Sequence, residues 1–196
     1  MSIKPYQPLA LRLLHGAVAL LVIGAWITGF LVYDSWDGRF GGLKLTLRDR
    51  SLIDIHGTFG FFLFYLFIIF AIYSLTAGRR KLIQSTTIKQ LSQVGKPVWW
   101  IGLQRVTNTT MLLAAIAAVG SGKLQDENWL PNGDLNQAAY FAHLISWVLV
   151  FLGLAIHVLM SAKVGGAPLL LSMVDRSVRS DDQLVQKLQK LLAKKK

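Results

Sequence analysis

Three long apolar segments dominate the pattern of the chain, at residues 9–33, 52–77 and 137–162. Each is about 25 residues long, and roughly 20 apolar residues in a helix suffice to cross a lipid bilayer. The first is too long for the apolar part of a signal peptide, and aromatic and charged residues follow it rather than a small-residue cleavage site. All three segments therefore predict membrane-spanning α-helices.

A further segment, which would be the third span in chain order, is apolar at its centre but polar at its start. Residues 106–120 form a shorter run that contains the stretch Thr-Asn-Thr-Thr. An extension back to Pro97 supplies enough length for a span, but it places Gln104 and Arg105 within the helix. We expect Arg105 either to extend toward the lipid headgroups or to meet a partner inside the protein. The pattern as a whole predicts an all-α membrane protein with a bundle of four transmembrane helices.

Basic residues predict the orientation of these helices. Of the 21 Lys and Arg residues, 16 lie in the N-terminal segment, in residues 78–105 and in the C-terminal segment, whereas the loops at 34–51 and 121–136 hold the other five. Because basic residues accumulate on the cytoplasmic side, both termini are predicted to be cytoplasmic. The net charge of +11 then reflects topology and contact with anionic membrane lipid, and we expect no nucleic-acid partner.

The chain after Pro168 is too polar for a further span. Ser180 and Gln183 resemble a helix capping box, and leucine and valine then recur at helical spacing among lysines. This pattern predicts a basic amphipathic helix on the membrane surface, or alternatively a docking helix for a cytoplasmic partner. We therefore divide the chain into a four-helix membrane domain, residues 1–167, and a basic amphipathic tail, residues 168–196.

Histidines supply the candidate chemistry. All four, His15, His56, His143 and His157, lie inside predicted spans. An ionisable side chain within a membrane is costly, and it usually has a function. His15 and His157 are at similar depth near the cytoplasmic side, and His56 and His143 are at similar depth near the outer side. His143 and His157, 14 residues apart, project from one face of the same helix at a separation of about 21 Å along its axis.

Two depth-matched pairs are typical of the axial ligands of two haem groups. Two imidazoles fill both axial positions of a haem iron, which suits electron transfer. Gly60 and Gly153 each lie one helical turn from a histidine and would leave room for a porphyrin. The alternatives are a proton or metal-ion path, or histidines that serve packing alone. The chain has no cysteine, which excludes thiolate ligands.

Three motifs together resemble the bacterial cytochrome b561 family. They are Arg12-x-x-His15 in the first span, His56-Gly57-x-x-Gly60 at the start of the second, and the spacing of His143 and His157 in the last. The superfamily includes the cytochrome b subunits of nickel–iron hydrogenase and formate dehydrogenase. The resemblance covers most of residues 8–163, although it does not extend to the polar start of the third span.

This resemblance implies a b-type cytochrome with two haem b groups, which transfers electrons across or within the membrane and is linked to quinone or quinol. By position, His15 and His157 would ligate the cytoplasmic haem, and His56 and His143 the outer haem. Arg12 would lie near a haem propionate, although it would also suit a lipid-headgroup anchor.

Several roles remain open at this point. The chain could be a free-standing quinone-linked oxidoreductase or the membrane-anchor cytochrome b subunit of a larger dehydrogenase or hydrogenase, with a redox subunit or a second copy as partner. Four basic residues of the first outer loop could steer superoxide toward an outer haem, or they are simply solvated: Arg39, Lys44, Arg48 and Arg50. A haem-free membrane scaffold or ion transporter is the competing class. The expected location is the bacterial inner (plasma) membrane, with another energy-transducing membrane as the alternative.

Overall fold

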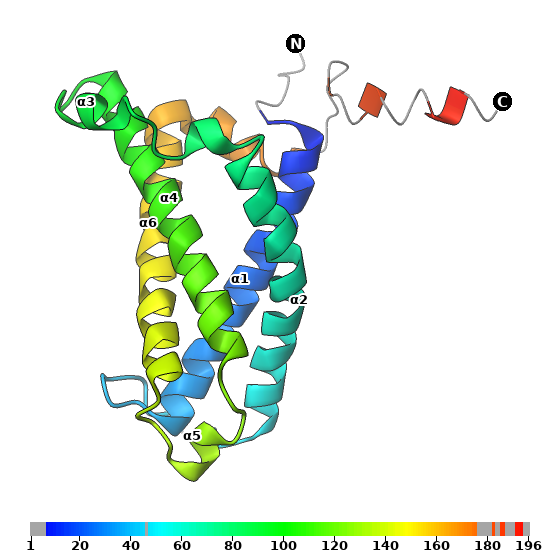
Figure 1. Ribbon diagram of the computed structural model, residues 1–196, viewed down its shortest axis with the longest axis vertical. Helices are drawn as coiled ribbons and strands as arrows, with labels where there is room; N and C mark the ends of the chain where they lie inside the picture. Colours follow the sequence, from blue (N-terminus) through cyan, green and yellow to red (C-terminus); the bar gives the residue numbers. More distant parts are fainter. Residues whose placement is uncertain (1–6, 46, 176–181, 183–184, 187–190, 194–196) are drawn as a thin grey trace.

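A computed structural model of the chain describes residues 7–45, 47–175, 182, 185–186 and 191–193. Within these ranges all regular structure is helical. The elements in chain order are α1 (Leu9–Trp36), α2 (Ser51–Leu75), η1 (Arg79–Lys81), α3 (Thr87–Leu91), α4 (Pro97–Lys123), α5 (Trp129–Asn132) and α6 (Ala138–Leu171). The four long helices α1, α2, α4 and α6 run alternately up and down and form a bundle (Figure 1). The all-α prediction is confirmed for the part of the chain that the structure describes.

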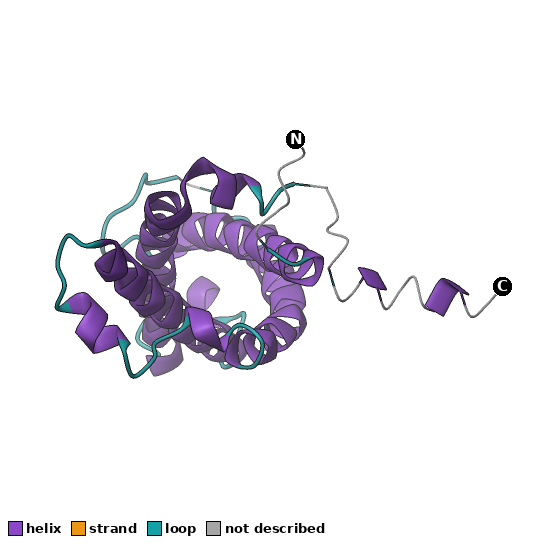
Figure 2. Cartoon of the chain, turned by 90° about the horizontal axis from the view of Figure 1, so that it is seen from above, coloured by secondary structure: helices purple, strands orange, loops and turns teal. Residues whose placement is uncertain are grey.

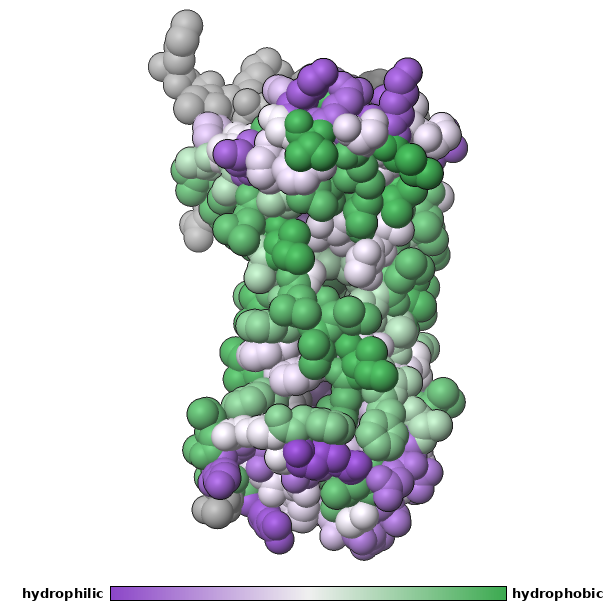
Figure 3. Space-filling view, turned by 90° about the vertical axis from the view of Figure 1, so that its left-hand side faces the viewer, coloured by the Kyte–Doolittle hydropathy of each residue, from purple (hydrophilic) through white to green (hydrophobic). Residues whose placement is uncertain are grey.

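Three of the described helices are long and apolar enough to cross a membrane. They are α1, α2 and α6, whose most apolar stretches have mean hydropathies of 2.1, 2.2 and 2.3. On the face shown in Figure 3, apolar side chains form a broad belt across the middle of the molecule, and polar side chains gather at both ends. These features define a helical membrane protein.

The helix α4 has the length of a span but is less apolar than the other three. It contains 27 residues and begins at Pro97, where the fixed backbone angle of proline suits the first helical position. Arg105 lies half-buried within it, and its guanidinium donates a hydrogen bond to Oε1 of Gln90, 3.1 Å away in α3. Of the two expectations for Arg105, the internal partner is confirmed.

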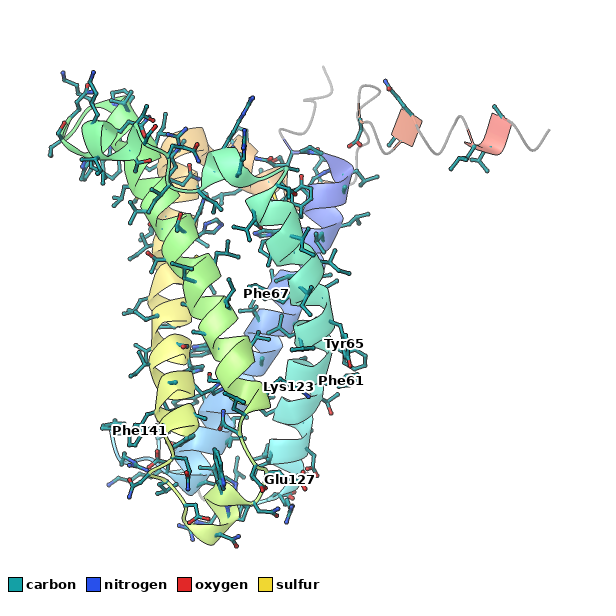
Figure 4. All side chains as sticks on the ribbon, viewed as in Figure 1. Phe61, Tyr65, Phe67, Lys123, Glu127 and Phe141 are labelled. Atoms are coloured by element: carbon teal, nitrogen blue, oxygen red, sulfur yellow. The ribbon has the colours of Figure 1, made fainter. Side chains whose placement is uncertain are left out.

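The helices associate as two close pairs, α1 with α2 and α4 with α6. Seen from above, all four surround the axis of the bundle (Figure 2). A small buried cluster joins three of them near the axis: Val18, Leu63, Phe67 and Leu112. Phe67 points into the bundle, whereas Phe61 and Tyr65 of the same helix project outward from it (Figure 4). Apolar side chains therefore cover the outside of the bundle, as contact with lipid requires.

The loop after α1 is ordered by a buried carboxylate. Asp34 is 8% exposed, and its side chain accepts hydrogen bonds from the main-chain amides of Leu43, Lys44 and Leu45. A buried charge of this kind needs several donors to offset its lost hydration. Asp34 therefore holds the loop between α1 and α2 against the end of the bundle.

The last helix is interrupted near its end. Gly166 has φ 66° and ψ −168°, values that a residue with a side chain rarely adopts, and Pro168 follows two residues later. Beyond this break, Asp182 accepts a hydrogen bond from the amide of Leu9 at 2.6 Å. The predicted amphipathic helix over residues 180–196 lies mostly outside the described residues.

Candidate haem sites

The four histidines meet as two facing pairs, one toward each end of the bundle. His15 of α1 faces His157 of α6, with ring centres 6.2 Å apart and ring planes 28° apart. His56 of α2 faces His143 of α6, with ring centres 6.0 Å apart and an angle of 77°. The structure thus pairs the same histidines that we paired by their depth in the predicted spans.

The spacing within each pair fits a metal ion held between two imidazoles. Each metal–nitrogen bond is about 2 Å and each nitrogen lies about 1 Å from its ring centre, so two imidazoles on opposite sides of one ion have centres roughly 6 Å apart. Among the described residues, no third His, Cys, Asp or Glu joins either pair. Each pair therefore offers two donors, which is the number that a haem iron takes from a protein when it is six-coordinate, because the porphyrin supplies four.

We call His56 and His143 the outer pair, and His15 and His157 the inner pair, after the side of the membrane that is predicted for each end of the bundle. The outer pair opens onto a large cavity between the two helix pairs. Its volume is about 800 Å³, within the range of 300–1,000 Å³ that is usual for small-molecule sites. Both histidines line it, together with Gly57 and Gly60, where an added Cβ would meet no other atom within 4 Å. The room expected at Gly60 is therefore present. The residues at this site fit a flat, largely apolar group of the size of a haem.

The room expected at Gly153 is absent. A Cβ at this position would lie 2.5 Å from Cγ of Met111. Gly153 is buried. Helix α4, which carries Met111, is the helix that α6 contacts most extensively. The prediction for Gly153 was wrong, because the glycine allows close helix packing rather than space for a cofactor.

Two other glycines let neighbouring helices approach the outer histidine rings. A Cβ on Gly29 of α1 would lie 3.0 Å from Cε1 of His56, and one on Gly122 of α4 would lie 3.2 Å from Cε1 of His143. Both distances are shorter than ordinary contacts, so a larger residue would displace the ring. Neither glycine stood out in the sequence, because glycine is frequent in membrane helices.

Hydrogen bonds fix the protonation of both outer rings. Nδ1 of His143 lies 2.9 Å from the carbonyl oxygen of Ala118, which can only accept, so Nδ1 carries the proton. Nδ1 of His56 lies 3.1 Å from the hydroxyl of Thr28. This hydroxyl already donates a hydrogen bond to the carbonyl of Gly24 at 2.7 Å. The hydroxyl therefore accepts from His56. In both rings Nε2 is left unprotonated, as a metal ligand requires.

An amide performs the same task at the inner pair. Nδ1 of His157 donates to Oδ1 of Asn108 at 2.8 Å, and Nδ2 of Asn108 donates to the carbonyl of Lys81 at 3.0 Å. Asn108 belongs to the polar stretch that made the third span look weak. The hydrogen bond to His157 explains why a polar residue stands at position 108.

Arg12 lies one helical turn before His15 and faces the protein rather than the lipid. It is 4% exposed, and its guanidinium donates to the main-chain carbonyl of Asp175. This position does not match a lipid-headgroup anchor. Its role near a haem propionate stays a prediction.

Two of the four basic residues in the first outer loop hold the outer end together. Arg39 pairs with Asp37 at 2.7 Å, and the same carboxylate accepts a hydrogen bond from the hydroxyl of Tyr140 at 2.8 Å. Arg50 pairs with Glu127 at 3.3 Å, and Glu127 lies at the outer end of the bundle (Figure 4). These two residues therefore have a structural role in connecting the outer loops.

The fold and the facing imidazoles define a class, the helical membrane cytochromes. A family model described as prokaryotic cytochrome b561 matches residues 6–176. The chain belongs to the prokaryotic cytochrome b561 family, which confirms the resemblance seen in its motifs. Membership makes it an integral membrane protein that binds haem b and transfers electrons. Neither the curated proteins nor the solved structures give a match.

Proposed function

We propose that this chain is a di-haem cytochrome b of the bacterial plasma membrane, which carries electrons between the two sides of the membrane and exchanges them with the quinone pool. The observation that supports two haems is the arrangement of the histidines as two facing pairs with ring centres 6.2 and 6.0 Å apart. A single site would need only one such pair. Family membership supports the haem type, and the resemblance to quinone-linked relatives supports the quinone.

The proposal includes four transmembrane helices, with α4 as the third span. A polar group within a membrane must find its partner inside the protein. In α4 the hydroxyl of Thr109 donates to the carbonyl of Arg105 at 2.9 Å, and both ends of the Asn108 amide are hydrogen-bonded. The side chains of Asn108 and Thr109 therefore have partners inside the protein. The helix runs beside α6 over the length of the bundle (Figure 1).

The residues of the chain hold and orient the cofactors. Helix α6 contributes one ligand to each site, and α1 and α2 contribute the opposite ligands. Thr28, Asn108 and the carbonyl of Ala118 keep the ligating nitrogens of His56, His157 and His143 unprotonated. A haem held between each pair of imidazoles would supply an iron that takes up and releases one electron. Two imidazoles at each site would leave no open position on the iron, which suits electron transfer rather than ligand binding at the metal.

The test is a count of haem in the purified protein. We expect two b-type haems per chain from the pyridine haemochrome assay, and a reduced-minus-oxidised spectrum typical of b-type cytochromes. A short-chain quinol should reduce both haems in the same preparation. One haem per chain would contradict the di-haem proposal, and a stably folded colourless protein would contradict haem binding altogether. Two haems that no quinol reduces would overturn the quinone link alone.

A further inference from the structure

The environment of His157 differs from that of the outer histidines. Its Nδ1 donates to a side-chain amide, Oδ1 of Asn108, whereas His143 uses a main-chain carbonyl and His56 uses a hydroxyl. A main-chain carbonyl cannot be changed without moving the helix. The Asn108 amide is therefore a point at which one amino-acid choice sets the hydrogen bond to one histidine.

The amide is also fixed in its orientation. Its nitrogen donates to the carbonyl of Lys81 at 3.0 Å, in the short helix η1 of the inner loop. Because a carbonyl can only accept, the amide nitrogen must face Lys81 and the amide oxygen must face His157. The loop that carries η1 therefore determines which end of Asn108 the histidine meets.

A second contact ties the same loop to the bundle independently of His157. The amide of Ile83 donates to the hydroxyl of Thr109 at 2.9 Å. Thr109 is adjacent to Asn108 in α4, but its hydroxyl bonds to the loop and to the carbonyl of Arg105 rather than to a histidine. Thr109 therefore provides a matched control, since it shares the loop contact of Asn108 and lacks the contact with the ligand.

We propose that Asn108 is a positioning residue that sets the midpoint potential of the inner haem through His157. This inference rests on the proposed function, in which His157 is an axial ligand. An acceptor on Nδ1 strengthens electron donation from the imidazole to the iron, which favours the ferric state and lowers the potential. The effect is confined to the inner site, because the outer histidines have partners of their own.

The test is a potentiometric titration of the purified holoprotein, followed by optical and EPR spectra. Asn108→Leu removes the acceptor at similar size, so the potential of one haem should rise while that of the other stays unchanged. The haem that responds should be the component that His157→Ala removes. Thr109→Val should leave both potentials where they are in the unsubstituted protein.

A second variant keeps the test decisive if Asn108→Leu does not assemble. Asn108→Asp retains an acceptor oxygen and adds negative charge, so the inner potential should fall below that of the unsubstituted protein. The inference is overturned if both Asn108 variants leave the potentials unchanged, or if Thr109→Val shifts the inner potential as far as Asn108→Leu does. If the unsubstituted protein contains no haem, the proposed function fails instead, so the two failures are distinguishable.

Discussion

Single residues with no metal-binding chemistry of their own shape the outer histidine pair. Gly122 brings α4 within 3.2 Å of the His143 ring, measured from the position that a Cβ would occupy. The hydroxyl of Thr28 accepts a hydrogen bond from His56 and donates one to the main-chain carbonyl of Gly24. Such neighbours orient a ligand, and substituting them typically weakens metal binding about 10–100-fold.

Gly122 offers a sharp test at this scale. A Gly122→Val side chain would collide with the His143 ring, so we expect the outer haem to be lost or weakly held while the inner haem is retained. Gly120 lies two residues earlier in α4, and a Cβ there meets no atom within 4 Å. Gly120→Val should therefore retain both haems. Haem content and difference spectra of the two variants make the comparison, and equal haem loss in both would contradict the role of Gly122.

The sequence predicted the histidines but not the residues that orient them. A histidine inside an apolar run stands out, and its depth follows from counting residues along a helix. Thr28, Asn108 and Gly122 carry no such signal, because hydroxyl, amide and glycine residues occur in membrane helices for many reasons. Their role depends on which helix faces meet, and this is decided by packing between distant segments.

At the scale of the helices, local pattern was sufficient to predict where the four long helices begin. The first segment was predicted at residues 9–33 and forms α1, Leu9–Trp36, and the third was predicted to begin at Pro97, where α4 begins. The predicted last span stopped at residue 162, whereas α6 continues to Leu171 across the break at Gly166. Apolar length marks where a helix meets the membrane surface, but it does not show how far the helix extends beyond it.

Topology can be tested with single cysteines, because the chain contains none. If α4 spans the membrane, residues before and after it lie on opposite sides. We expect a membrane-impermeant maleimide to label Asp134→Cys in intact cells, and to label Lys89→Cys only after the cells are opened. Both positions are exposed in the structure, so access to the reagent is not limited by packing. Labelling of both from the outside would contradict the four-span topology.

For the whole molecule, the space between the two helix pairs is the main feature. Each pair packs closely within itself, whereas contact across the bundle depends on large side chains such as Trp26 and Trp147, whose rings stack with centres 5.1 Å apart. The outer histidines line the cavity that this arrangement leaves. The cavity could not be predicted from the sequence, because it arises from how the two pairs are set apart. A cofactor bound there would join the pairs, so haem binding and bundle stability are linked.

The most direct test of two separate haem sites compares four purified variants: His15→Ala, His157→Ala, His56→Ala and His143→Ala. Reduced-minus-oxidised spectra at low temperature, with redox titration, resolve the components that each variant retains. Two distinct haem sites predict that His15→Ala and His157→Ala lose one component, and that His56→Ala and His143→Ala lose the other. Loss of the same component in His15→Ala and His56→Ala, with the other component intact, would contradict it.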